Sequence, residues 1–154
     1  MIDLLKKIAF TKEGYQKVQD DIRVLTEKRV GAVVNLRTAR EMGDLSENGA
    51  YKAARFELSA IDRELRRLNY LLRFGVVVES AHSGVIDFGS TITVKTGDKT
   101  MTFLLVDGYE SNPKEHKLSV KSPIGRALVG KKVGDQVIVV APAGKTTYVI
   151  LEVK

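Results

Sequence analysis

Two carboxylates, Asp44 and Glu47, are the residues whose type and spacing best suit chemistry, and both lie in the short stretch Gly43–Asn48. Carboxylate oxygens are hard ligands, and one or two of them can hold a Mg²⁺ ion that keeps several of its waters. The three-residue spacing places both on the same side of a first helical turn. It also has the form of a capping box, for which Ser46 is a rival cap. The spacing alone therefore leaves metal ligation and helix capping open.

Cationic residues flank these carboxylates at a distance of about one to two helical turns. They are Arg37, Arg40, Lys52 and Arg55. Such side chains can contact nucleic-acid phosphates without reading sequence, although the solvated face of a long helix explains them equally well. Arg29 is expected to pair with Asp62. The other arginines of the segment are interpreted as surface charge: Arg63, Arg66, Arg67 and Arg73.

Two heptad-like patterns on either side of the stretch predict the elements that position it. The first lies between Thr11 and Met42, a segment without proline, and comprises Tyr15, Val18, Ile22, Leu25, Ala32, Leu36 and Ala39. The second comprises Tyr51, Ala54, Leu58, Ile61, Leu65, Leu68 and Leu72. Because only a short turn separates the two helices, they must pair as an antiparallel coiled-coil hairpin, roughly 45 Å long at ~1.5 Å per residue. The pairing would set Leu36 opposite Ala54, Leu25 opposite Leu65 and Val18 opposite Leu72.

After Phe74-Gly75 the apolar period changes to two, which predicts strands. The expected strands lie within residues 90–94, 101–106, 136–140 and 146–153. One short helix is expected around 124–129, with Ser122 as its N-cap, Pro123 as its first residue and Gly130 at its end. We therefore predict an α+β chain. It has a helical hairpin over residues 1–75, a linker over 76–83, and a small antiparallel-sheet domain over 84–154.

Composition narrows the classes of function. The chain has 154 residues, of which 44% are hydrophobic and 29% charged, and no apolar run approaches the ~18 residues that span a bilayer. A globular cytoplasmic protein is expected. Cysteine is absent, and His82 and His116 are isolated, which argues against a zinc site or a cysteine nucleophile. The formal charge of +6 permits binding to polyanions. Phosphate loops and a Ser-His-Asp set are lacking, so a free-standing enzyme is disfavoured.

The residues around the turn read Ala39-Arg-Glu-Met-Gly-Asp-Leu-Ser-Glu-Asn-Gly-Ala-Tyr-Lys-Ala-Ala54. This string closely resembles the tip of the bacterial Gre transcript cleavage factors, in particular the GreA-like branch. Four further segments resemble the same family: Thr11–Tyr15, Phe88–Ser90, Ser122–Lys131 and Val133–Asp135. The resemblance therefore covers nearly the whole chain. It implies an N-terminal coiled coil and a C-terminal domain with an FKBP-like fold.

The resemblance also implies a partner, the core RNA polymerase of bacterial elongation complexes, whose own active site cleaves backtracked nascent RNA. Two metal ions ~4 Å apart suit such a hydrolysis. By resemblance, Asp44 would help to hold the second Mg²⁺ jointly with the polymerase, and Glu47 would orient or deprotonate the attacking water. The isolated protein, expected to be a monomer, would bind no metal of its own.

Two further groups have expected roles, the first because of its position around the tip and the second because of the resemblance. Arg37, Arg40, Lys52 and Arg55 would lie beside the extruded RNA 3′ end. Ser122, Pro123 and Ile124 would meet the rim of the polymerase's secondary channel, although a plain N-cap explains Ser122 and Pro123 as well.

Two alternatives stay open. The first is a Gre homologue that enters the channel and inhibits the polymerase. It is weakly favoured by Gly49-Ala50, which stands where the family commonly has Ala-Glu. The second is a coiled-coil nucleic-acid-binding module whose tip only caps a helix. The length of the released RNA is also open, because the tip is GreA-like whereas Ile61-Asp-Arg63 is similar to the GreB branch.

Overall fold

The computed structural model describes residues 7–44 and 47–154, which divide into two compact units. One unit contains Tyr15–Gly75, and the other combines Lys7–Gly14 with Val76–Lys154. The first predicted domain, residues 1–75, included the segment 7–14, which the structure groups with the second half of the chain. Among the described residues, none of the helices is long and apolar enough to cross a membrane.

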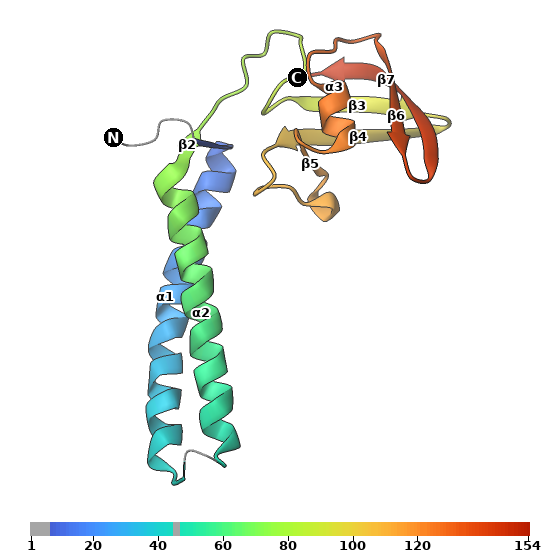
Figure 1. Cartoon of the computed structure of the whole chain (residues 1–154). Helices are drawn as coiled ribbons and strands as arrows, with labels where there is room; N and C mark the ends of the chain where they lie inside the picture. The colour runs from blue at the N-terminus through green and yellow to red at the C-terminus, as the bar shows by residue number, and fades with distance from the viewer. Residues whose placement is uncertain (1–6, 45–46) are drawn as a thin grey trace. The chain divides into compact units, whose positions relative to one another are not determined.

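Two long antiparallel helices make up most of the first unit and lie side by side (Figure 1). Helix α1 spans Lys12–Glu41 and helix α2 spans Gly49–Phe74. The predicted pair across the seam is present, since Arg29 Nε donates to Asp62 Oδ1 at 2.6 Å. Nearer the base, the Tyr15 hydroxyl donates to the carbonyl of Leu72 at 3.3 Å. The predicted coiled-coil hairpin is confirmed.

The seam between the helices is formed largely by the predicted residues. Those that are buried are Val18, Ala32, Ala39, Ala54, Ile61 and Leu68. The other predicted seam residues, Leu72 among them, are half-buried. Leu71 was not predicted and is nevertheless 2% exposed. It stands one residue before the seam position, whereas a straight α-helix drifts from a strict seven-residue repeat toward later positions, so the repeat does not account for its burial.

A two-stranded sheet forms where the chain enters α1 and leaves α2. Strand β1 spans Ile8–Phe10, and strand β2 spans Gly75–Val77. The amide of Val78 donates to the carbonyl of Phe10 at 2.9 Å, and the Phe10 side chain is 1% exposed. Three residues are too few to show a strand period, so this pairing could not be predicted.

The second unit is built on a five-stranded sheet of order β5-β4-β3-β7-β6. Its strands are β3 (Thr91–Thr96), β4 (Lys99–Val106), β5 (Lys117–Ser119), β6 (Gln136–Ala141) and β7 (Gly144–Val153). All neighbours pair antiparallel except β4 and β5, which are parallel. A 3₁₀ turn, η1 (Pro113–Glu115), leads into β5, and neither of these elements was predicted.

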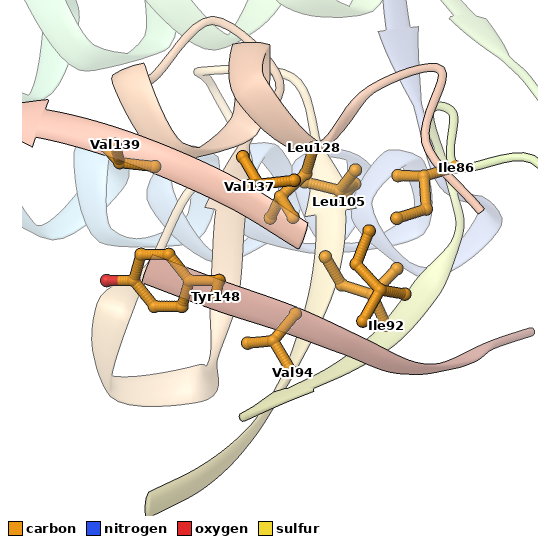
Figure 2. Close-up of a cluster of buried hydrophobic side chains, with 9 residues drawn as sticks. Ile86, Ile92, Val94, Leu105, Leu128, Val137, Val139 and Tyr148 are labelled. Carbon is orange, nitrogen blue, oxygen red and sulfur yellow. The ribbon is translucent and has the colours of Figure 1, made fainter. Parts of the chain in front are cut away.

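Helix α3, Pro123–Leu128, packs on the core of this sheet. Its N-cap is Ser122, whose hydroxyl accepts from the amide of Gly125 at 3.0 Å, as predicted. Figure 2 shows the core, which gathers side chains from β3, β4, β6, β7 and α3 and one, Ile86, from the segment before β3. Its buried members are Ile86, Ile92, Val94, Leu105, Leu128, Val137, Val139, Tyr148 and Ile150. The predicted α+β fold class is therefore confirmed: a helical hairpin followed by a mostly antiparallel sheet with one short helix.

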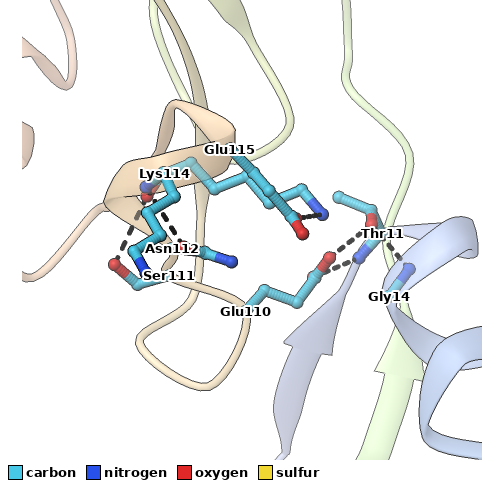
Figure 3. A network of polar contacts seen from close by, with 8 residues as sticks. Thr11, Gly14, Glu110, Ser111, Asn112, Lys114 and Glu115 are labelled. Atoms are coloured by element: carbon cyan, nitrogen blue, oxygen red, sulfur yellow. Dashed lines mark hydrogen bonds and ion pairs between the residues drawn. The ribbon is translucent and has the colours of Figure 1, made fainter.

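The first turn of α1 is held by a carboxylate from the β4–η1 loop (Figure 3). Glu110 accepts two hydrogen bonds from Thr11, one from the amide at 2.8 Å and one from the hydroxyl at 2.6 Å. The Thr11 hydroxyl in turn accepts from the amide of Gly14 at 3.0 Å and so caps the helix. A Cβ built on Gly14 would lie 2.0 Å from the Glu110 carboxylate, so only glycine leaves room for this contact.

Candidate functional site

The turn between α1 and α2 is organised by Asn48. Its side-chain amide donates to the carbonyl of Ala39 near the end of α1 at 2.7 Å, and its Oδ1 accepts from the amide of Tyr51 in α2 at 3.0 Å. Gly43 adopts a φ of +128°, a conformation that L side chains rarely adopt. One side chain therefore caps α2 and ties it to the preceding helix, which fixes both ends of the turn.

Asp44 and Glu47 lie between these two helices, and both are exposed. The prediction that they share a first helical turn is wrong, because α2 begins at Gly49, after both of them. The capping-box interpretation is also wrong for Asp44, since the cap of α2 is Asn48. Asparagine carries both a donor and an acceptor, so it satisfies a carbonyl of α1 and an amide of α2 together. The rival cap, Ser46, lies outside the described residues.

The donor set at the tip fits part of a magnesium shell. Asp44 and Glu47 offer carboxylate oxygens, which are the ligands that Mg²⁺ prefers. Within residues 7–44 and 47–154, no group of three or more His, Cys, Asp or Glu side chains is arranged to hold a metal ion. Two carboxylates near the tip can contribute to a shared ion, and the other ligands would have to come from water or a partner.

The four cations predicted beside the tip fall into two kinds. Arg37 lies 3.3 Å from the Glu41 carboxylate, and both side chains are exposed. Arg40, Lys52 and Arg55 are exposed too, but none of them has a carboxylate within 4 Å in the described part of the chain. These three are the better candidates for contact with an external anion.

The three residues predicted to dock a partner lie at the start of α3. Pro123 is exposed, whereas Ile124 is half-buried and packs against the core of the sheet. The Ser122 hydroxyl is engaged internally, because besides capping it donates to the carbonyl of Ser119 at 2.7 Å. Contacts within the second unit therefore account for Ser122 and Ile124. A docking role for this segment stays a prediction.

One group of residues was not singled out from the sequence. Phe56 is 72% exposed on α2, and together with Ser59 and Arg63 it borders the predicted cations Lys52 and Arg55. The signal was available: an aromatic residue stands at a position outside the apolar seam, with Lys52 four residues before it and Arg63 seven residues after it along the same helix.

The chain matches two family models in succession. Residues 8–77 match a model described as the N-terminal domain of a transcription elongation factor, and residues 81–154 match the C-terminal domain of the transcription elongation factors GreA and GreB. Together these models cover most of the chain. The chain therefore belongs to the GreA/GreB family of transcription elongation factors. The tip and the other segments that resemble this family had implied the same.

Among the relatives are several proteins named transcription elongation factor GreA. The one from Thermosipho africanus is 37% identical over 152 residues, which cover 97% of each chain. That from Neorickettsia sennetsu is 37% identical over 155 residues, covering 97% of this chain and 98% of the other. That from Thermosipho melanesiensis is 38% identical over 151 residues, or 96% of each chain.

Solved structures that match this chain include the GreA factor homolog 1 (Gfh1) of Thermus thermophilus. It is 25% identical, with 96% of this chain and 99% of that chain covered and a TM-score of 0.46. A prokaryotic transcription elongation factor GreA/GreB from Nitrosomonas europaea is 21% identical, with 67% of this chain and 92% of that chain covered and a TM-score of 0.42.

Proposed function

We propose that this elongation factor enters the secondary channel of RNA polymerase and stimulates the polymerase to cleave backtracked nascent RNA, thereby rescuing arrested complexes. One observation carries the proposal. Asp44 and Glu47 are exposed at the end of the hairpin, while Asn48 caps the following helix. Because Asn48 supplies the cap, the two carboxylates are not needed for that purpose and can serve as ligands.

Each carboxylate has a distinct task in this proposal. Asp44 would hold the second Mg²⁺ through its oxygens, jointly with aspartates of the polymerase. Glu47 would orient the attacking water or accept its proton. The ion, when bound, supplies alignment and polarisation of the reacting oxygens. The chain on its own would not be an enzyme, because the first metal ion and the RNA both belong to the polymerase active site.

Two other regions would support insertion. Arg40, Lys52 and Arg55 lack carboxylate partners in the described residues, so they would contact phosphates of the extruded RNA 3′ end without regard to sequence. The segment Ser122–Ile124 would meet the rim of the channel, where Pro123 offers an exposed surface. The factor would act as a monomer in the cytoplasm, where its partner is found.

A second function is favoured by one feature of α2. Its first turn contains no acidic residue and begins with Gly49-Ala50. A tip with fewer carboxylates holds an ion less strongly. A factor with such a tip could occupy the channel and inhibit the polymerase without promoting cleavage.

A stalled elongation complex with labelled RNA distinguishes the two functions. The parent chain should shorten backtracked RNA in the presence of Mg²⁺. Asp44→Asn and Glu47→Gln should each slow this cleavage on the order of 100-fold, which is a typical contribution of a positioned acid–base group. Binding to the polymerase should stay unchanged. Asp98→Asn, an exposed acid in the β3–β4 turn, provides the matched control.

Cleavage at the parent rate by both tip variants would refute the metal-holding role. Slower transcription without any cleavage by the parent chain would instead identify an inhibitor.

A further inference from the structure

The two edges of the five-stranded sheet are protected to different degrees. At one edge, β5 has only three residues, and Lys117 exchanges two backbone hydrogen bonds of 3.0 Å with Asn112. At the other edge, β6 has six residues. Within residues 7–44 and 47–154, no segment except β7 makes backbone hydrogen bonds to β6. The free N–H and C=O groups of such an edge are a template for pairing with another strand.

The side chains of β6 do not block such pairing. Residues 136–144 are the longest run of the chain without a charged residue, although 29% of the chain is charged. Ile138 and Val140 point away from the core and are 62% and 67% exposed. Val133, just before the strand, and Leu151 of the neighbouring β7 are exposed as well. Edge strands are usually protected by charges, so a long apolar edge without any calls for a partner.

We propose that this partner is a second copy of the chain, whose β6 pairs antiparallel with the first across a two-fold axis. In such a dimer the same surface of both copies meets, so the exposed aliphatic side chains cover each other. The seam holds no charge, so the formal charge of +6 on each copy places no like charges opposite one another there. A nucleic acid would need cations, and residues 136–144 contain none. The inference is independent of the proposed function, because it concerns the free factor.

The register of the pairing follows from the residues that would meet. An axis through Val139 pairs residues 137–141 of the two copies, all of which are apolar. It sets Ile138 of one copy opposite Val140 of the other, and cross-strand aliphatic pairs of this kind stabilise a sheet. An axis through Ile138 would instead set Val140 opposite the polar Gln136. The axis through Val139 therefore covers the apolar edge better.

The dimer should be weak. A standard interface uses about 20–30 residues from each partner, several times the number along this edge. Association is therefore expected only at high concentration, and dilution should return the monomer. Salt should not weaken it, because the seam is uncharged and salt screens the repulsion between the two positive copies. Association bridged by a nucleic acid would behave in the opposite way, since salt weakens phosphate contacts.

Sedimentation equilibrium of the full chain, from about 10 μM to about 1 mM, tests the proposal. The mass of the parent should rise with concentration from that of a monomer toward that of a dimer. Ile138→Lys should weaken association on the order of 100-fold, because an unpaired ammonium group would be buried in the seam. Val24→Lys adds the same charge at an exposed valine of α1, outside the seam, and should match the parent.

A mixture of two variants tests the register. Val140→Glu alone should also weaken association, because its carboxylate would be buried without a partner. When this variant is mixed with Ile138→Lys, the two new charges have opposite signs and face each other across the seam. The mixture should therefore associate about 10-fold more tightly than either variant alone. Such a rescue would also show that neither variant fails merely because it misfolds.

Three outcomes overturn the inference. If the parent stays monomeric over the whole range, no second copy binds this edge, and a strand of a different protein becomes the candidate. If Val24→Lys weakens association as much as Ile138→Lys does, the copies meet through another surface. If the mixture associates no better than its components, the two-fold axis does not pass through Val139.

Discussion

Two helix starts in this chain lie close to carboxylates, and they use them differently. At the start of α1, Glu110 accepts two hydrogen bonds from Thr11, and Gly14 leaves the space that the carboxylate fills. At the start of α2, a neutral asparagine supplies the cap, and the nearby carboxylates Asp44 and Glu47 stay exposed. A carboxylate beside a helix N-terminus is thus structural where it receives the hydrogen bonds of the first turn. It is a candidate for chemistry where another residue receives them.

Removal of the Glu110 carboxylate should have the largest effect on stability. Glu110→Ala should cost about 2–3 kcal/mol in the second unit, because the Thr11 amide and hydroxyl both lose a charged acceptor. The double variant Asp44→Asn/Glu47→Gln should change stability by less than ~0.5 kcal/mol, as is usual for exposed positions. Denaturant-dependent hydrogen exchange of the second unit and of the hairpin measures both. If both variants lost the same unfolding free energy, the carboxylates at the two helix starts would not differ in their structural role.

Adding a methyl group at Gly14 should have the next largest effect. Gly14→Ala places a Cβ against the Glu110 carboxylate, so the carboxylate must move away from Thr11, at a cost of about 1–2 kcal/mol. In a Glu110→Ala background the same substitution should be neutral, or stabilising by up to ~1 kcal/mol, because alanine favours helix more than glycine does. A double-mutant cycle on unfolding free energies checks the coupling. Simple additivity would show that the glycine is there for another reason.

Changes to the cap of α2 should be smaller. Asn48→Ala should cost about 1 kcal/mol, a typical value for a lost N-cap. Asn48→Asp keeps the acceptor for the Tyr51 amide but loses the donor to the Ala39 carbonyl. It should therefore preserve the first turn of α2 and loosen only the link to α1. Exchange rates of the Tyr51 amide report the cap. A fast-exchanging Tyr51 amide in the aspartate variant would mean that the link to α1, and not the cap, orders the turn.

The smallest effect should come from a carboxylate of a third kind, Asp62, which is paired across the seam. The hydrogen bond from Arg29 lowers the pKa of Asp62. Because the folded pKa lies below the unfolded value of about 3.9, the pair stabilises the hairpin above that pH and loses its effect as pH falls through the folded pKa. Arg29→Met should therefore melt slightly lower than the parent at neutral pH. The difference in melting temperature between the two proteins should close in acid. A difference that widens there would mean that the pair does not stabilise the hairpin through the ionised Asp62.

Periodic features of the chain could be predicted from its sequence. The two apolar seams follow from regular spacings along each helix. Pairing these seams predicts the contact of Arg29 with Asp62, 33 residues away, and the Ser122 cap follows from the residue types at the start of α3. The regular strands β3, β4, β6 and β7 were predicted by their alternation. The burial of Leu71 could not be predicted in this way, because Leu71 lies outside the seven-residue repeat that the seam follows.

Features that depend on distant or very short segments could not be predicted. Thr11 and Glu110 are 99 residues apart, and no local pattern links them. Strands β1, β2 and β5 have three residues each, too few for a period to be visible. At the tip, the carboxylates were predicted but their relation to the helix was not. Three residues, Asp44, Ser46 and Asn48, have side chains that suit an N-cap, and only the structure selects Asn48.

The grouping of Lys7–Gly14 with Val76–Lys154 makes the second unit discontinuous in sequence, with residues 15–75 inserted between its parts. Closing so long a loop is entropically costly when its interior is a random chain. The inserted segment is a hairpin whose contacts spread outward from a tight turn, so each step of pairing closes only a small additional loop. Zipping from Asn48 toward the base would deliver β1 to β2 last. The inserted hairpin would thereby bring the two parts of the second unit together during folding.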